Sequence, residues 1–236
     1  MYIFTTLKTK CSSLLQLFLG LALLLGVSKS DPDPLQDYCI ANNKSPQSFF
    51  ASSTPCIDPN QAVVSHFVTS ILSEPGNTSG NLFGSSRTLT NTVNFPGLNT
   101  MGLAMARLDL AAGGIIPPHM HPRASEVTIC LKGPLTVGFV DSSDRLFMQI
   151  LQPGDSFVFP KGLIHFLYNP NSKTPALTLS GLNSQSPGFH LTSVATFASK
   201  PEIPDEVLKK AFQINDQDVK RIRNNLKEVD YACLCK

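Results

Sequence analysis

The chain has 236 residues, with 19 lysines and arginines against 17 aspartates and glutamates. This length is enough for one domain with a sizeable hydrophobic core. The near balance of charge, with no basic stripe before the C-terminal segment, excludes the electrostatic footprint of a nucleic-acid-binding protein.

Residues 1–30 have the pattern of a secretory signal peptide. Lys8 and Lys10 precede an almost unbroken apolar run over 14–26, and the small residues Ser28 and Ser30 fit cleavage after residue 30. A membrane anchor is the alternative, but the run is shorter than the roughly 20 residues that a span needs. We therefore expect secretion and no membrane span. Cleavage would remove Lys8, Lys10 and Lys29 and no acidic residue, which leaves 16 basic against 17 acidic residues in the mature chain.

The stretch before the first strands is polar and irregular in composition. Segment 31–60 is rich in Pro, Asn, Ser and Asp, which predicts an N-terminal arm, and 61–72 fits a short strand or a helix. Residues 73–100 are mostly Ser, Thr, Asn and Gly and are expected to form a long loop. Asn77 and Asn43 lie in glycosylation sequons, and the polar surroundings of Asn77 make it the better candidate.

The cysteines suit a secreted protein. Cys39 and Cys56 flank a short polar loop and predict a disulfide. Closing a loop of about 16 residues stabilises a fold by on the order of 3 kcal/mol. Cys130 lies in an apolar run and is expected to be a buried thiol. Cys233 and Cys235 can pair with each other, pair with another chain or stay free, and the sequence does not decide.

From residue 101 the chain becomes a series of short apolar segments. They recur at intervals of roughly 8–12 residues and are separated by Gly, Pro or Asp-Ser turns, which predicts a β-sandwich or barrel. We place this β-barrel within 61–200. The predicted strands are 101–110, 125–131, 134–140, 145–151, 155–159, 163–168 and 175–182.

The C-terminal segment 201–236 is predicted to hold helices and a tail. Segments 203–212 and 216–229 carry apolar residues at three- and four-residue steps, and Asn215 is the expected N-cap of the second helix. Their apolar faces are expected to cover one end of the barrel or to dock on another subunit. Their basic residues are expected to be a solvated helix face. These are Lys209, Lys210, Lys220, Arg221, Arg223 and Lys227.

Four side chains form a candidate metal site: His119, His121, Glu126 and His165. Residues two apart in a strand face the same side, so His119 and His121 point together. Glu126 follows after a bend, and His165 comes from a later strand. Three imidazoles and a carboxylate are a ligand set for one divalent metal ion per chain. An octahedral ion would keep two positions for water or substrate, which favours Mn²⁺, with Zn²⁺ and Fe²⁺ as alternatives.

The distribution of histidines supports a shared site. The chain has five histidines, and three of them fall in the two segments best placed to present them. Any one histidine taken alone is more often an isolated surface or core residue. His66 and His190 lie outside these segments, and we expect them to be ordinary structural or surface residues.

The two segments resemble the two sequence motifs of the cupin superfamily, G-x5-H-x-H-x4-E-x6-G and G-x5-P-x-G-x2-H-x3-N. Every motif position is filled, by Gly113, His119, His121, Glu126 and Gly133 in the first and by Gly154, Pro160, Gly162, His165 and Asn169 in the second. Around them, DPDPLQDYC, PPHMHPRASE, FVFPKGLIHF and SGLNSQSPG look like the germin-like proteins of plants. This resemblance covers residues 31 to about 229.

The resemblance implies an all-β fold with C-terminal helices, namely a single-domain cupin jelly-roll β-barrel. It also implies manganese on the four candidate ligands and a disulfide between Cys39 and Cys56. It further implies secretion to the apoplast and cell wall, with cell-wall components as partners and a role in plant defence or stress. The expected assembly is a homohexamer, a trimer of dimers in which the C-terminal helices clasp the neighbouring subunit.

Activity differs among germins. True germins are oxalate oxidases, other members show superoxide dismutase activity, and many have no demonstrated chemistry. Oxalate-oxidising germins place two asparagines near the metal, at positions that match Ala106 and Ile116 here. Burying a dianion against apolar walls is costly, so we expect superoxide dismutation rather than oxalate oxidation. The alternative is a non-enzymatic, receptor-like or structural wall protein with a structural metal.

Overall fold

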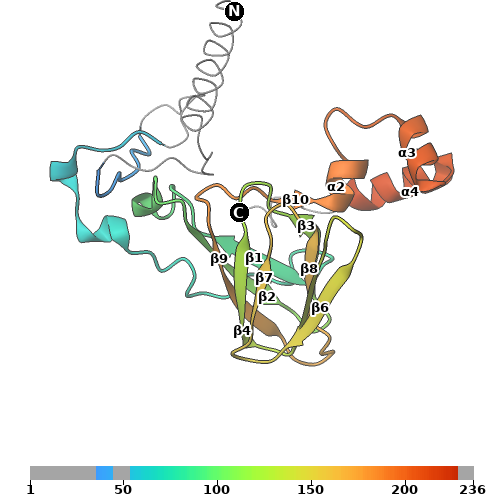
Figure 1. Cartoon of the computed structure of the whole chain (residues 1–236), viewed down its shortest axis with the longest axis horizontal. Helices are drawn as coiled ribbons and strands as arrows, with labels where there is room; N and C mark the ends of the chain where they lie inside the picture. Colours follow the sequence, from blue (N-terminus) through green and yellow to red (C-terminus); the bar gives the residue numbers. More distant parts are fainter. Residues whose placement is uncertain (1–35, 45–53, 228–236) are drawn as a thin grey trace, which may run out of the picture. The chain divides into compact units, whose positions relative to one another are not determined.

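The computed structural model of the chain describes residues 36–44 and 54–227 (Figure 1). The predicted signal peptide and the cysteines at 233 and 235 lie outside these ranges. No helix in the described ranges is long and apolar enough to cross a membrane. The elements in chain order are η1 (Pro59–Gln61), η2 (Val64–Phe67), β1 (Ser85–Leu89), η3 (Pro96–Leu98), β2 (Ala104–Leu110), β3 (Ile115–Met120), β4 (Glu126–Lys132), β5 (Leu135–Val140), β6 (Leu146–Leu151), β7 (Ser156–Phe159), β8 (His165–Tyr168), β9 (Ala176–Leu182), β10 (His190–Leu191), α2 (Thr192–Phe197), α3 (Asp205–Phe212) and α4 (Asp216–Lys227).

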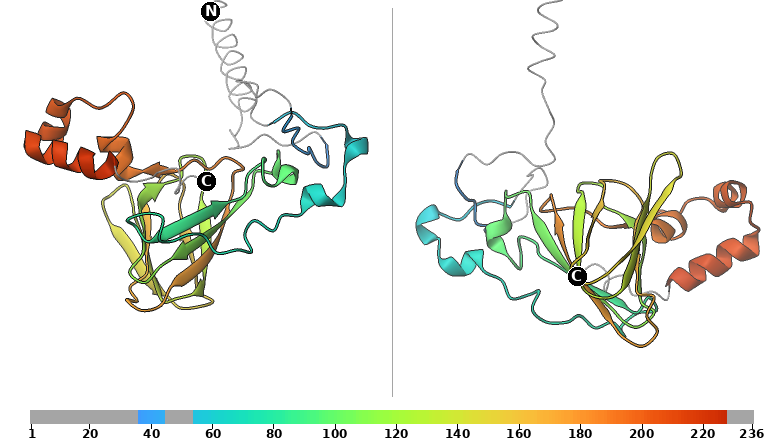
Figure 2. Two further views of the ribbon diagram at one scale, coloured as in Figure 1. Left: turned by 180° about the vertical axis from the view of Figure 1, so that it is seen from behind. Right: turned by 60° about the horizontal axis from the view of Figure 1, so that its bottom comes forward.

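The strands form two antiparallel five-stranded sheets that face each other (Figures 1 and 2). One sheet has the order β1-β2-β9-β4-β7 and the other β10-β3-β8-β5-β6. The chain passes repeatedly from one sheet to the other, so most neighbouring strands are distant in sequence. This double-sheet arrangement is a jelly roll followed by C-terminal helices, which confirms the predicted fold class.

The hydrophobic core lies between the two sheets. Along β2, Ala104, Ala106 and Leu108 are buried, whereas Met105 between them is exposed, as the two-residue period of a strand requires. Further core residues come from both sheets, with Ile116, Leu135, Val137 and Leu167 of one facing Leu110, Cys130 and Phe159 of the other. The predicted burial of Cys130 is confirmed, and the thiol is free. This packing gives the site described below a rigid wall on two sides.

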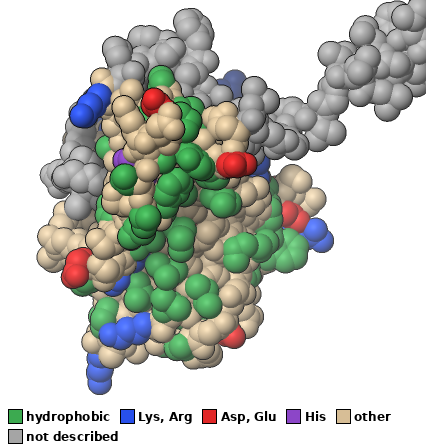
Figure 3. Space-filling model, turned by 90° about the vertical axis from the view of Figure 1, so that its left-hand side faces the viewer, with side chains coloured by type: hydrophobic (Ala, Val, Ile, Leu, Met, Phe, Trp, Pro, Cys, Tyr) green, Lys and Arg blue, Asp and Glu red, His purple; other side chains and the backbone are tan. Residues whose placement is uncertain are grey.

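Several large apolar side chains point away from this core. Met105, Val127 and Val158 are exposed on strands of one sheet, and Met148 and Ile150 are exposed on β6 of the other. Figure 3 shows a face on which hydrophobic side chains gather in the middle while charged side chains lie toward the edge. Apolar patches of this kind mark interaction surfaces in soluble proteins.

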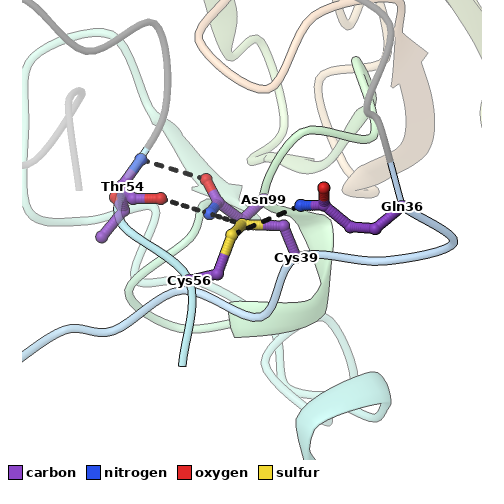
Figure 4. Close-up of a disulfide and its surroundings, with 5 residues drawn as sticks. All are labelled: Gln36, Cys39, Thr54, Cys56 and Asn99. Atoms are coloured by element: carbon purple, nitrogen blue, oxygen red, sulfur yellow. Dashed lines mark hydrogen bonds between the residues drawn. A yellow bond between two sulfur atoms is a disulfide. The ribbon is translucent and has the colours of Figure 1, made fainter. Parts of the chain in front are cut away.

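The predicted disulfide between Cys39 and Cys56 is present (Figure 4). Asn99, which is fully buried, holds its surroundings in place. The Asn99 amide donates to the carbonyl oxygen of Thr54 at 2.6 Å and to Cys39 Sγ at 3.1 Å, and its Oδ1 accepts from the Thr54 N–H at 3.1 Å. The arm is therefore tied to the segment that carries Asn99 as well as closed by the disulfide.

An ion pair on β2 holds the segment before β1. The guanidinium of Arg107 donates twice to the carboxylate of Asp109, at 2.9 Å each, and also donates to the carbonyl oxygens of Leu72 and Ser73. Asp109 in turn accepts from the backbone N–H of Gly76 at 2.9 Å. The Asp109 carboxylate raises the pKa of Arg107. This pair fixes residues 72–76 against the strand.

The C-terminal helices pack around their own small core. Phe197 of α2, Leu208 of α3, and Val219 and Leu226 of α4 form one buried cluster. Asn215 caps α4 as predicted, because its Oδ1 accepts from the N–H groups of residues 217 and 218. The basic residues described on these helices are exposed or paired with acids of the same segment, as a solvated face requires. The pairs are Lys209 with Glu206 and Asp216, Arg221 with Asp218, and Arg223 with Glu202 and Asp205.

One sequence prediction of secondary structure was wrong, one is met in part, and two short elements were not predicted. The predicted loop 73–100 contains β1, a polar strand that exists because it pairs with β2 over Ser85–Leu89, a contact that local composition does not reveal. Segment 61–72, expected to be a short strand or a helix, is helical in part, since it contains the end of the 3₁₀ helix η1 and the whole of the 3₁₀ helix η2. The pair β10 and α2 was not predicted, because two strand residues and six helix residues are too short to show a periodic pattern.

Candidate metal centre

His119, His121, Glu126 and His165 converge between the two sheets. His119 of β3 and His165 of β8 are register partners, His121 directly follows β3, and Glu126 opens β4 in the opposite sheet. One ligand atom from each residue lies within 4.8 Å of the others. All four side chains are buried, with exposed fractions of 1–5%. The structure thus brings together all four residues that the sequence selected.

The backbone around the two first histidines departs from a regular ladder. Pro117 and Pro118 in β3 cannot donate ladder hydrogen bonds, and the register with β8 shifts just before His119. The carbonyl oxygen of His121 accepts a hydrogen bond from the N–H of Gly162 at 3.0 Å. Gly162 has φ of 75°, a left-handed conformation that favours glycine. These local features turn His119 and His121 toward the same centre.

Each of the three imidazoles is oriented by a hydrogen bond from Nδ1 to a backbone carbonyl oxygen. The Nδ1 to O distances are 2.8 Å for His119 to Pro117, 2.6 Å for His121 to Gly188, and 2.9 Å for His165 to Leu163. A carbonyl oxygen can only accept, so the proton of each neutral ring lies on Nδ1. The three Nε2 lone pairs are therefore available inside the cluster, the arrangement that metal-ligating histidines have.

The carboxylate of Glu126 closes the cluster. Its Oε2 lies 2.8 Å from Nε2 of His121 and 3.6 Å from Nε2 of His165. With the proton on Nδ1, the lone pair of His121 Nε2 faces a carboxylate oxygen, and this contact is favourable only with a cation or a second proton between them. Nε2 of His165 is buried and has no hydrogen-bond partner among the described residues. The donor set therefore fits a divalent metal ion.

Electrostatics favour the protonation states that ligate metals. Burial, followed by the neighbouring imidazoles of His165 and His121, lowers the pKa of His119 well below its ordinary value. Burial alone would raise the pKa of Glu126, but the imidazoles of His121 and His165 beside its carboxylate outweigh this effect, so its pKa lies below the ordinary range. A neutral imidazole and an ionised carboxylate are the forms that bind a metal.

A small cavity lies against the cluster. Its volume is about 10 Å³, roughly the space for one water molecule. Ala106 and Ile116 line it, as expected from their sequence positions, and Leu89, Leu108 and Leu182 add further apolar wall.

Comparison with known proteins shows the family to which this chain belongs. Residues 70–220 match the protein family described as Cupin. Germin-like protein subfamily 1 member 1 of Arabidopsis thaliana is 57% identical over 214 residues, which cover 90% of this chain and 99% of that protein. The chain belongs to the germin-like proteins of the cupin family. Germin-like protein 3-1 of Oryza sativa subsp. japonica is 49% identical over 215 residues, covering 89% of this chain and 96% of that protein.

Solved structures that share the fold of this germin-like protein are named for different activities. An oxalate oxidase in complex with the substrate analogue glycolate has a TM-score of 0.78 and 36% identity, covering 83% of this chain and 97% of that one. Peruvianin-I, described as a cysteine peptidase from Thevetia peruviana latex, has a TM-score of 0.65 and 34% identity, covering 69% of this chain and 98% of that one. Activity must therefore be argued from the residues of the site.

Arg87 and Phe189 are among the cavity residues that sequence reasoning about this germin-like protein did not select. Arg87 lies in β1, which was expected to be loop, and Phe189 directly precedes β10. The sequence held one weak signal of this placement. Arg87 and Leu89 are two residues apart, so they would face the same side if the segment were a strand. In the structure both residues line the cavity.

His66 and His190 lie apart from the cluster. Nδ1 of His66 accepts a hydrogen bond from the N–H of Val63 at 3.2 Å, at the start of η2. His190 is exposed on β10. Both have the ordinary surface or structural placement that we expected.

The two sequon asparagines are exposed but differ in their hydrogen bonds. The amide nitrogen of Asn43 donates to the carbonyl oxygens of Thr92 and Val93, at 3.2 and 3.3 Å. Asn77 uses its amide oxygen instead, which accepts from the N–H and the hydroxyl of Ser79. Since a glycan is attached through the amide nitrogen, these contacts favour Asn77. Glycosylation of either residue stays a prediction.

Proposed function

We propose that this germin-like protein is a secreted manganese protein of the plant cell wall and apoplast, that it acts in defence or stress, and that it dismutes superoxide and does not oxidise oxalate. The observation that carries the proposal is the orientation of the three imidazoles. Their Nδ1 protons are held by carbonyl oxygens, so three Nε2 lone pairs and the Glu126 carboxylate surround one point.

Manganese would suit this donor set, because one carboxylate and three imidazoles could hold the ion and leave it able to take exchangeable ligands. A manganese ion held there supplies one-electron redox chemistry. In the overall reaction, one superoxide is oxidised to dioxygen, and a second is reduced to hydrogen peroxide with two protons taken from water. The chain holds the ion through the four ligands, and Glu126 adds one negative charge beside it. No described residue lining the cavity, apart from the cluster, can act as a separate general base.

The lining of the cavity argues against a dianionic substrate, because its residues outside the cluster are mostly apolar. Ala106 and Ile116 offer no side-chain donor to a second carboxylate. Oxalate would therefore be poorly solvated, and burial of unpaired charge is costly.

The assembly proposed for this chain is a homohexamer built as a trimer of dimers. Two observations support an assembly of copies. Exposed apolar side chains gather on one face (Figure 3), and Leu103, Met105 and Val127 line an apolar groove on one sheet. The buried C-terminal cluster leaves Val207 and Phe212 of α3 exposed, as a helix that clasps a neighbouring subunit would.

A non-enzymatic wall protein is the second candidate. The specific observation in its favour is the enclosure of the cluster: all four ligands are buried, and the adjoining cavity holds roughly one water molecule. In that role the metal stabilises the barrel, and surface loops bind a wall component. A wall partner retained after mutation of the ligands would support this role.

The deciding experiment measures superoxide dismutation per bound manganese in the secreted protein, compared with free Mn²⁺. The test variant is His121→Ala, and the matched control is His190→Ala, which removes an exposed imidazole on the neighbouring strand. We expect manganese and activity in the parent and the control and neither in His121→Ala. A parent that binds manganese and is no more active than the free ion would refute the enzymatic role and leave the scaffold role.

A further inference from the structure

Two short segments beside the metal cluster are held together by hydrogen bonds. The first, residues 122–125, links two of the metal ligands, and the second, residues 183–189, links β9 to β10. At one end the N–H of Ser125 donates to Oδ1 of Asn183 at 2.7 Å, and the N–H of Asn183 donates to the carbonyl oxygen of Ser125 at 3.3 Å. The connection between two ligands is therefore fixed to a segment that is distant in the chain.

Arg123 makes the contacts at the other end. Its backbone N–H donates to the carbonyl oxygen of Pro187 at 3.1 Å. Its guanidinium donates through Nε to the carbonyl oxygen of Ser186 at 2.5 Å and through Nη2 to the hydroxyl of Ser186 at 3.1 Å. An added Cβ at Gly188 would lie 3.2 Å from Nη2, so the guanidinium lies against the backbone of that residue as well. One exposed arginine thus contacts the consecutive residues 186–188.

Segment 183–189 carries two groups that belong to the metal site. The carbonyl oxygen of Gly188 accepts from Nδ1 of His121 at 2.6 Å, which leaves the Nε2 lone pair of that ring for a metal. Phe189 lines the cavity, and its ring lies 4.6 Å from the ring of His119. The two carbonyl oxygens that Arg123 holds, on residues 186 and 187, directly precede Gly188. Arg123 therefore limits how far the Gly188 carbonyl can move.

The guanidinium is suited to this task. Its donors form a fixed planar fork, so two of them can reach one residue in a defined orientation. The acceptors are a carbonyl oxygen and a hydroxyl of Ser186, and neither is charged. The contact therefore fixes the position of the segment and does not neutralise a charge. A lysine could donate to one of these acceptors but could not reproduce the fork.

We propose that Arg123 is a positioning residue for the ligand His121 and that it acts through residues 186–188. Arg123 contributes no ligand atom and does not line the cavity. The inference deepens the proposed function and rests on it in one respect, namely that the cluster binds a metal. Loss of an outer partner of a metal-ligating histidine typically reduces metal affinity by about 10- to 100-fold. Because Arg123 acts one step further from the metal, we expect a reduction at the lower end of this range.

The first measurement is manganese affinity, determined by competition with a chelator. The test variant is Arg123→Met, which removes the guanidinium donors and keeps an unbranched side chain. The matched control is Arg145→Met, because Arg145 is also exposed and also donates through Nε and Nη2, but to Asp141 in the turn between β5 and β6. We expect about tenfold weaker binding in Arg123→Met, parent-like binding in the control and an intermediate affinity in Arg123→Lys. Parent-like affinity in Arg123→Met would refute the proposal.

The second measurement separates positioning from a general loosening of the fold. In the metal-free protein with isotope-labelled histidine, nuclear magnetic resonance reports how fast each Nδ1 proton of the cluster exchanges with water. We expect Arg123→Met to speed this exchange at His121 and to leave it unchanged at His119 and His165, whose partners are the carbonyl oxygens of Pro117 and Leu163. Unchanged exchange at His121, or equal acceleration at all three histidines, would overturn the positioning role.

The two measurements also keep this inference distinct from the proposed function. A parent protein that binds no manganese would refute the proposed function, while proton exchange in the metal-free protein would still decide the role of Arg123. Should Arg123→Met not fold, Arg123→Lys provides both readings, with smaller changes expected in the same direction.

Discussion

Replacing Gly188 with alanine should weaken metal binding although Gly188 contributes no ligand atom. Its carbonyl oxygen accepts the Nδ1 proton of His121 at 2.6 Å. Its φ is +73°, and an added Cβ would lie 2.8 and 3.0 Å from ring carbons of Pro122. The proline ring is rigid and belongs to the residue after His121. The backbone at residue 188 must therefore move, and its carbonyl oxygen moves with it.

The size of the effect follows from two contributions. A left-handed conformation costs an L-residue roughly 1–2 kcal/mol, which lowers the free energy of unfolding of Gly188→Ala. Loss of an outer hydrogen bond to a metal-ligating histidine typically reduces metal affinity by about 10- to 100-fold. We therefore expect a modest loss of stability without metal and a larger loss with metal.

The assay is competition for manganese with a chelator, together with thermal unfolding in the presence and absence of the metal. Gly181→Ala is the matched control, because an added Cβ at Gly181 meets nothing within 4 Å. If Gly188→Ala lost stability but bound manganese as tightly as the control, the carbonyl of Gly188 would not be what positions His121.

Three further predictions concern stability. The double variant Cys39→Ser, Cys56→Ser should lose about 3 kcal/mol in the free energy of unfolding, measured with denaturant, and an unchanged midpoint would contradict the role of the closed loop. The variant Arg107→Met should lose about 2 kcal/mol in the free energy of unfolding, because it leaves the Asp109 carboxylate without its bidentate partner. Residues 72–76 should then be cleaved faster by proteases. Cleavage at the parent rate would argue against the role of this ion pair in holding the segment. The metal-free protein should lose stability as the pH falls from 7 to 5. The folded pKa of His119 lies below the ordinary 6.5, so the unfolded chain takes up the proton first, and the stabilisation present above pH 6.5 is lost at up to about 1.4 kcal/mol per pH unit. Thermal unfolding of His119→Gln should show a flatter pH dependence, and equal slopes would exclude His119 as the source.

The site residues were easier to predict from the sequence than the strands around them. His119 and His121 share one strand and Glu126 follows within a few residues, so their relation is a matter of local spacing. His165 is distant in sequence but lies in a second recognisable motif. Turn residues between apolar segments likewise marked most strands of the barrel.

Arg87 and Phe189 could not be found in this way. Arg87 is buried because β1 pairs with β2, and the polar composition of β1 gives no sign of that non-local contact. Phe189 reaches the cluster from a short segment beside β10, where two strand residues carry no readable period. The orientation of the imidazoles could not be predicted from the sequence either. The carbonyl oxygen that accepts from His121 belongs to Gly188, which is 67 residues away from His121 in the chain.

The position of the cluster between the sheets has a consequence for unfolding. His119 and His165 belong to one sheet and Glu126 to the other, so an ion held by all three acts as a non-covalent cross-link through the middle of the barrel. Separating the sheets would break its coordination. Free metal at 100 times its dissociation constant would add about 2.7 kcal/mol to the free energy of unfolding. If the protein is secreted to the cell wall as proposed, the lifetime of the folded barrel there would depend on the local supply of metal as much as on the packing of its hydrophobic core.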